Sequence, residues 1–119
     1  MNMTPTVMVV EDEPAILRMV ARVLESMGCD VVPADDAEAA IHQLEESHPD
    51  IVITDVRLPG MSGLELAERI EADAPDTTVV LMSAYGEPRE HHADAFIAKP
   101  FDPDELVELL DPLLGSPDE

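Results

Sequence analysis

Cysteine and aromatic side chains are scarce in this sequence. It has one cysteine, Cys29, no tryptophan, and three aromatic residues, Tyr85, Phe96 and Phe101. One cysteine excludes an intramolecular disulfide and a metal site built from several thiolates, and it favours a reducing, cytoplasmic location. The shortage of aromatic rings predicts a core made of aliphatic side chains.

Basic residues are rare as well. Six Lys and Arg residues stand against 27 Asp and Glu, so the formal net charge is −21. Proteins bind nucleic acids by neutralising phosphates with Lys and Arg, so this balance argues against a DNA or RNA partner and against anionic membranes. Two interpretations of the acidity stay open: it promotes solubility, or it is an adaptation to a salty cytoplasm, where charges are screened within roughly 3 Å at 1 M salt.

Long hydrophobic stretches are missing too. No apolar run approaches the roughly 20 residues of a membrane span, and residues 1–6 lack the basic and apolar regions of an export signal. A length of 119 residues suffices for one core but not for two. We therefore expect one soluble domain over 1–119, with its core at about 6–114 and a short disordered tail at 115–119.

What the sequence does contain is an alternation of short apolar runs with segments of helical period. Such alternation predicts an α/β fold in which a doubly wound parallel sheet is covered by helices on both faces. Five strands are expected, at Val7–Val10, Val31–Val32, Ile51–Thr54, Val79–Met82 and Ala95–Ala98. Helices are expected at about Pro14–Met27, Asp36–Glu46, Leu64–Glu71 and Pro103–Leu114, with Pro59, Gly60 and Gly63 in a loop.

The stretch between the last two expected strands is short. Tyr85–Asp94 would have to supply a loop, a helix and another loop, whereas an average helix alone takes roughly 11 residues. Pro88 and the polar run 89–92 leave no apolar stripe there. We therefore expect the fourth helix of the fold to be short or absent.

Polar residues follow four of the expected strands: Glu11-Asp12-Glu13, Asp55, Ser83 and Lys99. Parallel strands bring their carboxyl ends to one edge, where open α/β sheets bind ligands. Carboxylates crowded there repel one another unless a cation lies among them, and their hard oxygen atoms suit Mg²⁺. One carboxylate could then attack a phosphoryl group, with an ammonium and a hydroxyl to contact its oxygens.

Each of these residues also has a simpler interpretation. An acidic turn before a helix is stabilised by the helix dipole, and we keep that interpretation for Glu13. Asp55 could cap a turn or helix, and Lys99 could be a surface lysine. The position of Glu11 and Asp12 after a buried strand favours the metal interpretation for these two residues. The presence of Lys99 and Ser83 favours the phosphoryl interpretation for Asp55, and Lys99 is the only lysine of the chain.

Four segments together resemble the response-regulator receiver family of two-component signalling, and they span nearly the whole chain. They are Val9–Pro14 (VVEDEP), Asp55–Gly63 (DVRLPGMSG), Met82–Gly86 (MSAYG) and Ala98–Phe101 (AKPF). The resemblance implies a five-stranded sheet of the flavodoxin-like order 2-1-3-4-5. It also implies that the segment expected to lack a helix belongs to the face that usually transmits the signal.

The resemblance assigns the acidic residues as follows. Glu11 and Asp12 would form the metal-binding pair, and Asp55 would be the phosphoacceptor and a third metal ligand. Arg57 would offer its backbone carbonyl to the metal. The implied cofactor is Mg²⁺.

The remaining site residues are assigned in the same way. Ser83 would provide the hydroxyl that moves to the phosphoryl group, and Lys99 would contact both the phosphoryl group and Asp55. The Lys99-Pro100 peptide bond is expected to be cis. Phe96 would occupy the position of the aromatic switch that responds to Ser83.

A function follows from the resemblance. A histidine kinase or a histidine phosphotransfer protein would pass a phosphoryl group to Asp55, which would then lose it by slow self-hydrolysis, so the protein would not be an enzyme acting on other substrates. No output domain is visible in the sequence. We therefore expect a single-domain, chemotaxis-type regulator, monomeric or weakly dimeric, that signals by protein contacts to an unknown target.

Several alternatives remain open. The protein could be a phosphorelay intermediate or a receiver with an altered output surface, or a receiver that binds metal without accepting phosphate, against which Asp55, Ser83 and Lys99 argue. An FMN-binding electron carrier would need a Gly/Ser/Thr-rich phosphate cradle after the first strand, where acidic residues stand instead. An aspartyl phosphatase would place a second Asp two residues after the nucleophile, at the position of Arg57.

The two interpretations of the acidity differ in a measurable way. If the charge is an adaptation to salt, the thermal midpoint of unfolding should rise steeply with KCl, because screening relieves repulsion in the folded state. A calorimetric melting series in KCl measures this. A midpoint that does not change with KCl would leave solubility as the explanation.

Overall fold

The structure is a five-stranded parallel sheet covered by helices. The computed structural model describes residues 4–114, so the tail expected at 115–119 lies outside the described residues. The strands are β1 (Thr6–Val10), β2 (Asp30–Ala34), β3 (Ile51–Asp55), β4 (Thr78–Ser83) and β5 (Ala95–Ala98). Their order is β2-β1-β3-β4-β5 with every neighbouring pair parallel, which confirms the expected fold class and strand order.

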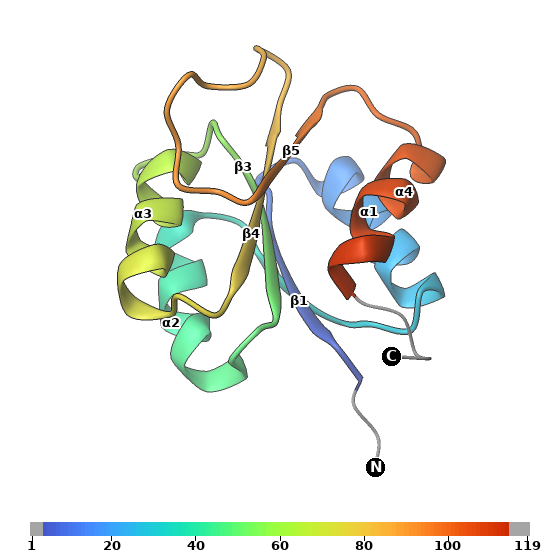
Figure 1. The fold of residues 1–119 in the computed structure, drawn as a ribbon, viewed down its shortest axis with the longest axis horizontal. Helices are drawn as coiled ribbons and strands as arrows, with labels where there is room; N and C mark the ends of the chain where they lie inside the picture. The colour runs from blue at the N-terminus through green and yellow to red at the C-terminus, as the bar shows by residue number, and fades with distance from the viewer. Residues whose placement is uncertain (1–3, 115–119) are drawn as a thin grey trace.

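Four helices are found in the described residues, two on each face of the sheet: α1 (Pro14–Ser26), α2 (Ala37–Ser47), α3 (Gly63–Asp73) and α4 (Pro103–Leu114). Helices α1 and α4 cover one face, and α2 and α3 cover the other (Figure 1). No helix within residues 4–114 combines the length and hydropathy needed to cross a bilayer.

Strand β1 shows why the apolar runs are continuous. Val7 and Val9 pack in the core under α1 and α4, whereas Met8 and Val10 pack in the core under α2 and α3. Successive strand residues point to opposite faces, so a strand covered on both faces must be apolar at every position. The core is aliphatic, as expected, with Phe101 as the only aromatic residue among its buried members.

The start of α3 is defined by a reciprocal cap. The Ser62 hydroxyl accepts a hydrogen bond from the Glu65 backbone N–H, and the Glu65 carboxylate accepts one from the Ser62 N–H. Both groups satisfy donors that the first helical turn leaves without an internal partner. Gly63, which the sequence placed in the preceding loop, is therefore the first residue of the helix.

The crossover from β4 to β5, residues 84–94, contains no helix, as expected. Its end is tied to β4, because the Asp94 N–H donates to the Val79 carbonyl and the Asp94 carboxylate accepts from the Val79 N–H, both at 2.8 Å. His92 Nδ1 lies 2.8 Å from Glu71 Oε1 on α3. Polar contacts thus hold the crossover where an apolar helix face would otherwise pack.

The core also sets the reactivity of the one thiol. Cys29 is 6% exposed, and burial, reinforced by the nearby carboxylates of Asp30 and Asp50, raises its pKa.

Because only the thiolate attacks disulfide reagents, we expect an aromatic disulfide reagent at mildly alkaline pH to modify Cys29 in the folded protein far more slowly than in the urea-unfolded chain. Absorbance of the released thiol measures both rates, and Cys29→Ala is the blank. Equal rates would contradict the buried position.

Candidate functional site

The carboxyl ends of four strands meet at one edge of the sheet and bring the expected residues together. Glu11 directly follows β1, Asp55 ends β3, Ser83 ends β4, and Lys99 follows β5. The pairing register accounts for their closeness, because the last residues of adjacent strands lie at the same level: Val10 is opposite Thr54, Asp55 opposite Met82, and Ser83 opposite Ala98.

Lys99 joins two of the acidic residues. Its Nζ donates to Glu11 Oε1 at 2.8 Å and to Asp55 Oδ2 at 2.9 Å. The side chains are almost enclosed, with exposed fractions of 12% for Lys99, 0% for Glu11 and 11% for Asp55. The second oxygen of Glu11 accepts a hydrogen bond from the Glu13 N–H at 3.1 Å. The buried charges are therefore paired and hydrogen-bonded, the condition under which burial is tolerated.

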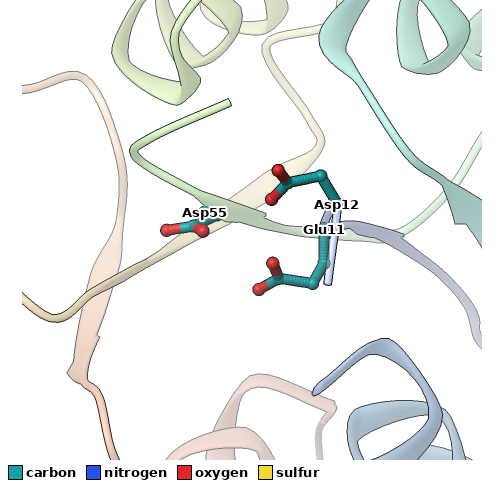
Figure 2. A group of neighbouring side chains, drawn as sticks. All are labelled: Glu11, Asp12 and Asp55. Atoms are coloured by element: carbon teal, nitrogen blue, oxygen red, sulfur yellow. The ribbon is translucent and has the colours of Figure 1, made fainter. Parts of the chain in front are cut away.

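Asp12 completes an acidic cluster with Glu11 and Asp55. One carboxylate oxygen from each lies within 4.8 Å of the others, and Figure 2 shows Glu11 and Asp12 extending from the end of β1 toward the side where Asp55 lies. These three carboxylates and the single Lys99 ammonium leave two negative charges in excess. A divalent ion would neutralise that excess, and the all-oxygen donor set fits a hard cation such as Mg²⁺.

Burial and pairing act in opposite directions on the two central groups. Burial raises the pKa of Glu11, although the hydrogen bonds from Lys99 and Glu13 oppose the effect. Burial would lower the pKa of Lys99, but its hydrogen bonds to Glu11 and Asp55 outweigh this, so the pKa is raised. Lys99 is therefore held as an ammonium, and a cation beside Glu11 would favour its ionised form.

A cavity of about 250 Å³ opens above the cluster, lined by Asp12, Glu13, Asp55, Arg57, Ala84, Tyr85 and Lys99. Ser83 is 3% exposed beside it, and its Oγ accepts a hydrogen bond from the Tyr85 N–H at 3.0 Å. The cavity is large enough for a phosphoryl group with its water molecules, and it leads from solvent to the Asp55 carboxylate.

The other expected residues lie at the edge of this site or beyond it. Arg57 is exposed in the loop after β3, and Phe96 is half-buried in the edge strand β5. The Lys99-Pro100 bond is cis, as expected. The metal role of the Arg57 carbonyl and the switch role of Phe96 stay predictions.

Gly63 is a site residue that the sequence did not reveal. A Cβ built on it would lie 2.9 Å from the Asp55 carbonyl carbon and closer still to the carbonyl oxygen. The Gly63 N–H also donates to the Val56 carbonyl at 2.9 Å. The start of α3 thus rests on the backbone of Asp55. In the sequence, Gly63 was noted only as a loop glycine and as the last residue of the Asp55–Gly63 segment.

The fold and this acidic edge define a class of doubly wound α/β domains with a charged site at the carboxyl ends of the strands. Comparison with known proteins makes the assignment specific. Residues 7–111 match the response regulator receiver domain, and the chain belongs to that family. The family expected from the four sequence segments is confirmed.

Curated relatives give the same result. The chain is 42% identical over 113 residues to the phosphate regulon transcriptional regulatory protein PhoB of Klebsiella pneumoniae, an alignment that covers 88% of this chain and 49% of that protein. PhoB of Escherichia coli is 40% identical over the same coverage. The chain therefore spans about half the length of the curated relatives it matches.

Solved structures share the architecture. A putative response regulator from Chloroflexus aurantiacus superposes with a TM-score of 0.87 at 30% identity, covering 96% of this chain and 100% of that one. The response regulator TrrA of Thermotoga maritima, solved in complex with Mg²⁺-BeF, superposes with a TM-score of 0.85 at 32% identity, covering 92% and 99%.

The contact at Gly63 predicts a specific effect of an added methyl group. Gly63→Ala should lower the free energy of unfolding by about 1–3 kcal/mol, the usual cost of overpacking, and should weaken Mg²⁺ binding because the Asp55 backbone must shift. Urea unfolding and isothermal titration with Mg²⁺ measure the two effects. The control is Gly28→Ala. Its added methyl group meets nothing within 4 Å, but the φ of +86° is strained, so this variant should lose stability and keep the wild-type Mg²⁺ affinity. Wild-type Mg²⁺ affinity in Gly63→Ala would refute the contact.

Removing the Lys99 ammonium should lower the free energy of unfolding by an amount that depends on pH. Lys99→Ala leaves Glu11 buried without its partner, and breaking a buried pair costs about 3–5 kcal/mol. The pKa of Glu11 is already raised by burial, and it should rise further in this variant. The folded state then takes up a proton as pH falls, so the decrease in the free energy of unfolding should become smaller below neutral pH. Urea unfolding at several pH values measures this. The control Arg69→Ala breaks an exposed pair with Asp73 and should leave the free energy of unfolding almost unchanged. A decrease in Lys99→Ala that does not depend on pH would contradict this explanation.

Proposed function

We propose that this domain accepts a phosphoryl group on Asp55 from the phosphohistidine of a histidine kinase or histidine phosphotransfer protein, in a reaction that requires Mg²⁺. The observation that carries the proposal is the Lys99 ammonium, shared at 2.8 and 2.9 Å by Glu11 and Asp55 beneath an open cavity. This arrangement pairs a nucleophilic carboxylate with a fixed positive charge. Phosphoryl transfer needs little more from a protein than such positioning and charge.

Three carboxylates, from Glu11, Asp12 and Asp55, would hold the metal together with the Arg57 backbone carbonyl. The bound ion would neutralise charge on the oxygens of the transferring phosphoryl group. Support comes from the clustering of the three carboxylates and from the similar regulator TrrA, whose structure is a complex with Mg²⁺-BeF.

The residues of this chain would share the remaining work. Lys99 holds one oxygen of the Asp55 carboxylate and so restricts its orientation. The Asp55 oxygen forms a bond to phosphorus as the bond from phosphorus to the donor histidine nitrogen breaks, and the histidine recovers its neutral form. Ser83 would donate its hydroxyl hydrogen to a phosphoryl oxygen, and Lys99 would contact another.

Output would pass through protein contacts rather than through chemistry on another substrate. Movement of the Ser83 hydroxyl toward the phosphoryl group would be sensed by Phe96 in β5. The crossover without a helix, residues 84–94, favours an altered output surface or a role as a phosphorelay intermediate. A cytoplasmic location, where kinases of this kind phosphorylate their partners, is part of the proposal.

Direct phosphorylation tests the function. Incubation with acetyl phosphate and Mg²⁺ should add the mass of one phosphoryl group in intact mass spectrometry, and chelation of the metal should prevent it. Asp55→Ala should abolish the adduct. Asp50→Ala should keep it, because Asp50 lies before β3 at the opposite edge of the sheet, where its carboxylate accepts from the Thr6 N–H. An adduct that persists in Asp55→Ala would refute the assignment of the phosphoacceptor.

A further inference from the structure

Two aspartates join neighbouring strands at the amino edge of the sheet, opposite the acidic site. The Asp94 N–H donates to the Val79 carbonyl, and the Asp94 carboxylate accepts from the Val79 N–H, both at 2.8 Å. Asp50 repeats this arrangement on Thr6, with its N–H donating at 2.8 Å and its carboxylate accepting at 2.9 Å. Each reciprocal pair of hydrogen bonds, here termed a clamp, stands directly before a strand: β5 for Asp94 and β3 for Asp50.

The clamp at Asp94 fixes where the pairing of β5 begins. Asp94 and Val79 directly precede the first pair of the two strands, Ala95 opposite Val80. Lys99 follows five positions after Asp94. Because a strand advances by about 3.3 Å per residue, the position of Asp94 determines how far along the sheet Lys99 reaches.

The side chains of β5 do little to select this register. All four residues of Ala95–Ala98 are apolar. Ala95 and Ile97 pack with the core under α1 and α4, whereas Phe96 is half-buried and Ala98 is exposed. A slip of one residue moves apolar side chains from the core to solvent only when polar and apolar residues alternate, and in β5 they do not. Hydrogen bonds at the start of the strand must therefore contribute to the selection.

Strand β5 also lacks the support that β3 has. It pairs with β4 alone at the edge of the sheet, and the crossover before it contains no helix. Strand β3, which Asp50 precedes, pairs with β1 over four residues and with β4 over five. The clamp at Asp50 is thus one of many contacts that hold β3, whereas the first residue of β5 depends on the clamp at Asp94.

We propose that Asp94 is a positioning residue for the Lys99 ammonium. Its clamp on Val79 sets the register of β5, and this register brings the ammonium between Glu11 and Asp55. A slip of one residue would move Lys99 by about 3.3 Å and turn its side chain to the other face of the sheet. The hydrogen bonds of 2.8 and 2.9 Å to Glu11 and Asp55 would then be lost. The consequence for phosphorylation rests on the proposed function of Asp55, and the placement of Lys99 does not.

The single lysine makes the placement directly observable. Lys99 is the only lysine of the chain, so protein labelled with ¹³C-lysine gives the NMR signals of one side chain. At one fixed pH and without Mg²⁺, these signals in Asp94→Ala should move toward those of the urea-unfolded chain, because the ammonium leaves its two carboxylates. Asp94→Asn should keep the wild-type signals, since its amide oxygen can still accept from the Val79 N–H.

Asp50→Ala is the matched control. It removes the same charge and the same kind of clamp from the same edge of the sheet, but β3 keeps its register through both neighbours. Its Lys99 signals should equal those of the wild type. If circular dichroism shows that Asp94→Ala is unfolded, Asp94→Glu takes its place, because the added methylene displaces the carboxylate from the Val79 N–H and keeps the charge.

Three results of the NMR comparison would overturn the inference. The first is a wild-type Lys99 signal in the folded variant that lacks the clamp. The second is an equal change in Asp50→Ala, which would mean that any loss of charge or stability moves the lysine. The third is a displaced signal in Asp94→Asn, which would mean that the charge of Asp94 acts rather than its hydrogen bonds.

Phosphorylation gives a second measurement, made at a temperature at which every variant is folded. With acetyl phosphate and Mg²⁺, Asp94→Ala should gain the phosphoryl mass about ten- to a hundredfold more slowly than the wild type, the effect expected when a group is misplaced by roughly 1 Å. Asp94→Asn and Asp50→Ala should react at the wild-type rate. A displaced Lys99 signal together with a wild-type rate would overturn the role of Asp94 in the reaction.

The outcomes separate this inference from the proposed function. If the wild type accepts no phosphate, the proposed function fails, and the NMR comparison still decides whether Asp94 places Lys99. If the wild type accepts phosphate, and folded Asp94→Ala has both the wild-type signal and the wild-type rate, the inference fails while Asp55 keeps its role.

Discussion

The ammonium of Lys99, placed between Glu11 and Asp55, is the interaction on which the rest of the site depends. A carboxylate as enclosed as that of Glu11 is costly to ionise, and its raised pKa reflects this cost. The lysine offsets part of it through two short hydrogen bonds, yet the cluster keeps an excess of negative charge. A divalent cation bound among these carboxylates would neutralise that excess.

Parallel topology makes this arrangement possible. Residues 11, 55 and 99 are 44 positions apart from one to the next, and they meet because each follows or ends a strand whose neighbour finishes at the same level. The packing of α3 on the Asp55 backbone through Gly63 completes the placement. The fold tolerates the loss of one helix: β5 pairs in register with β4 although the crossover 84–94 contains no helix.

The site divides into a floor and a rim with different physical constraints. On the floor, the charged groups of Glu11, Asp55 and Lys99 are buried and paired with one another. The Arg57 and Tyr85 side chains on the rim are exposed and contribute little to stability.

Much of this protein was predictable from the sequence. Apolar strands and helical periods determined the α/β class, the short stretch after Ser83 determined the missing helix, and acidic residues after buried strands determined the candidate site. These features are local, since burial pattern and chain length act within a few residues. The resemblance had already implied the contact of Lys99 with Asp55. Only the tertiary structure decided that Lys99 also pairs with Glu11, that Gly63 packs against the Asp55 carbonyl, and that Arg57 lies over the Tyr85 ring. Each of those contacts joins separate segments, and its geometry arises from register and packing, which no single stretch of the chain contains.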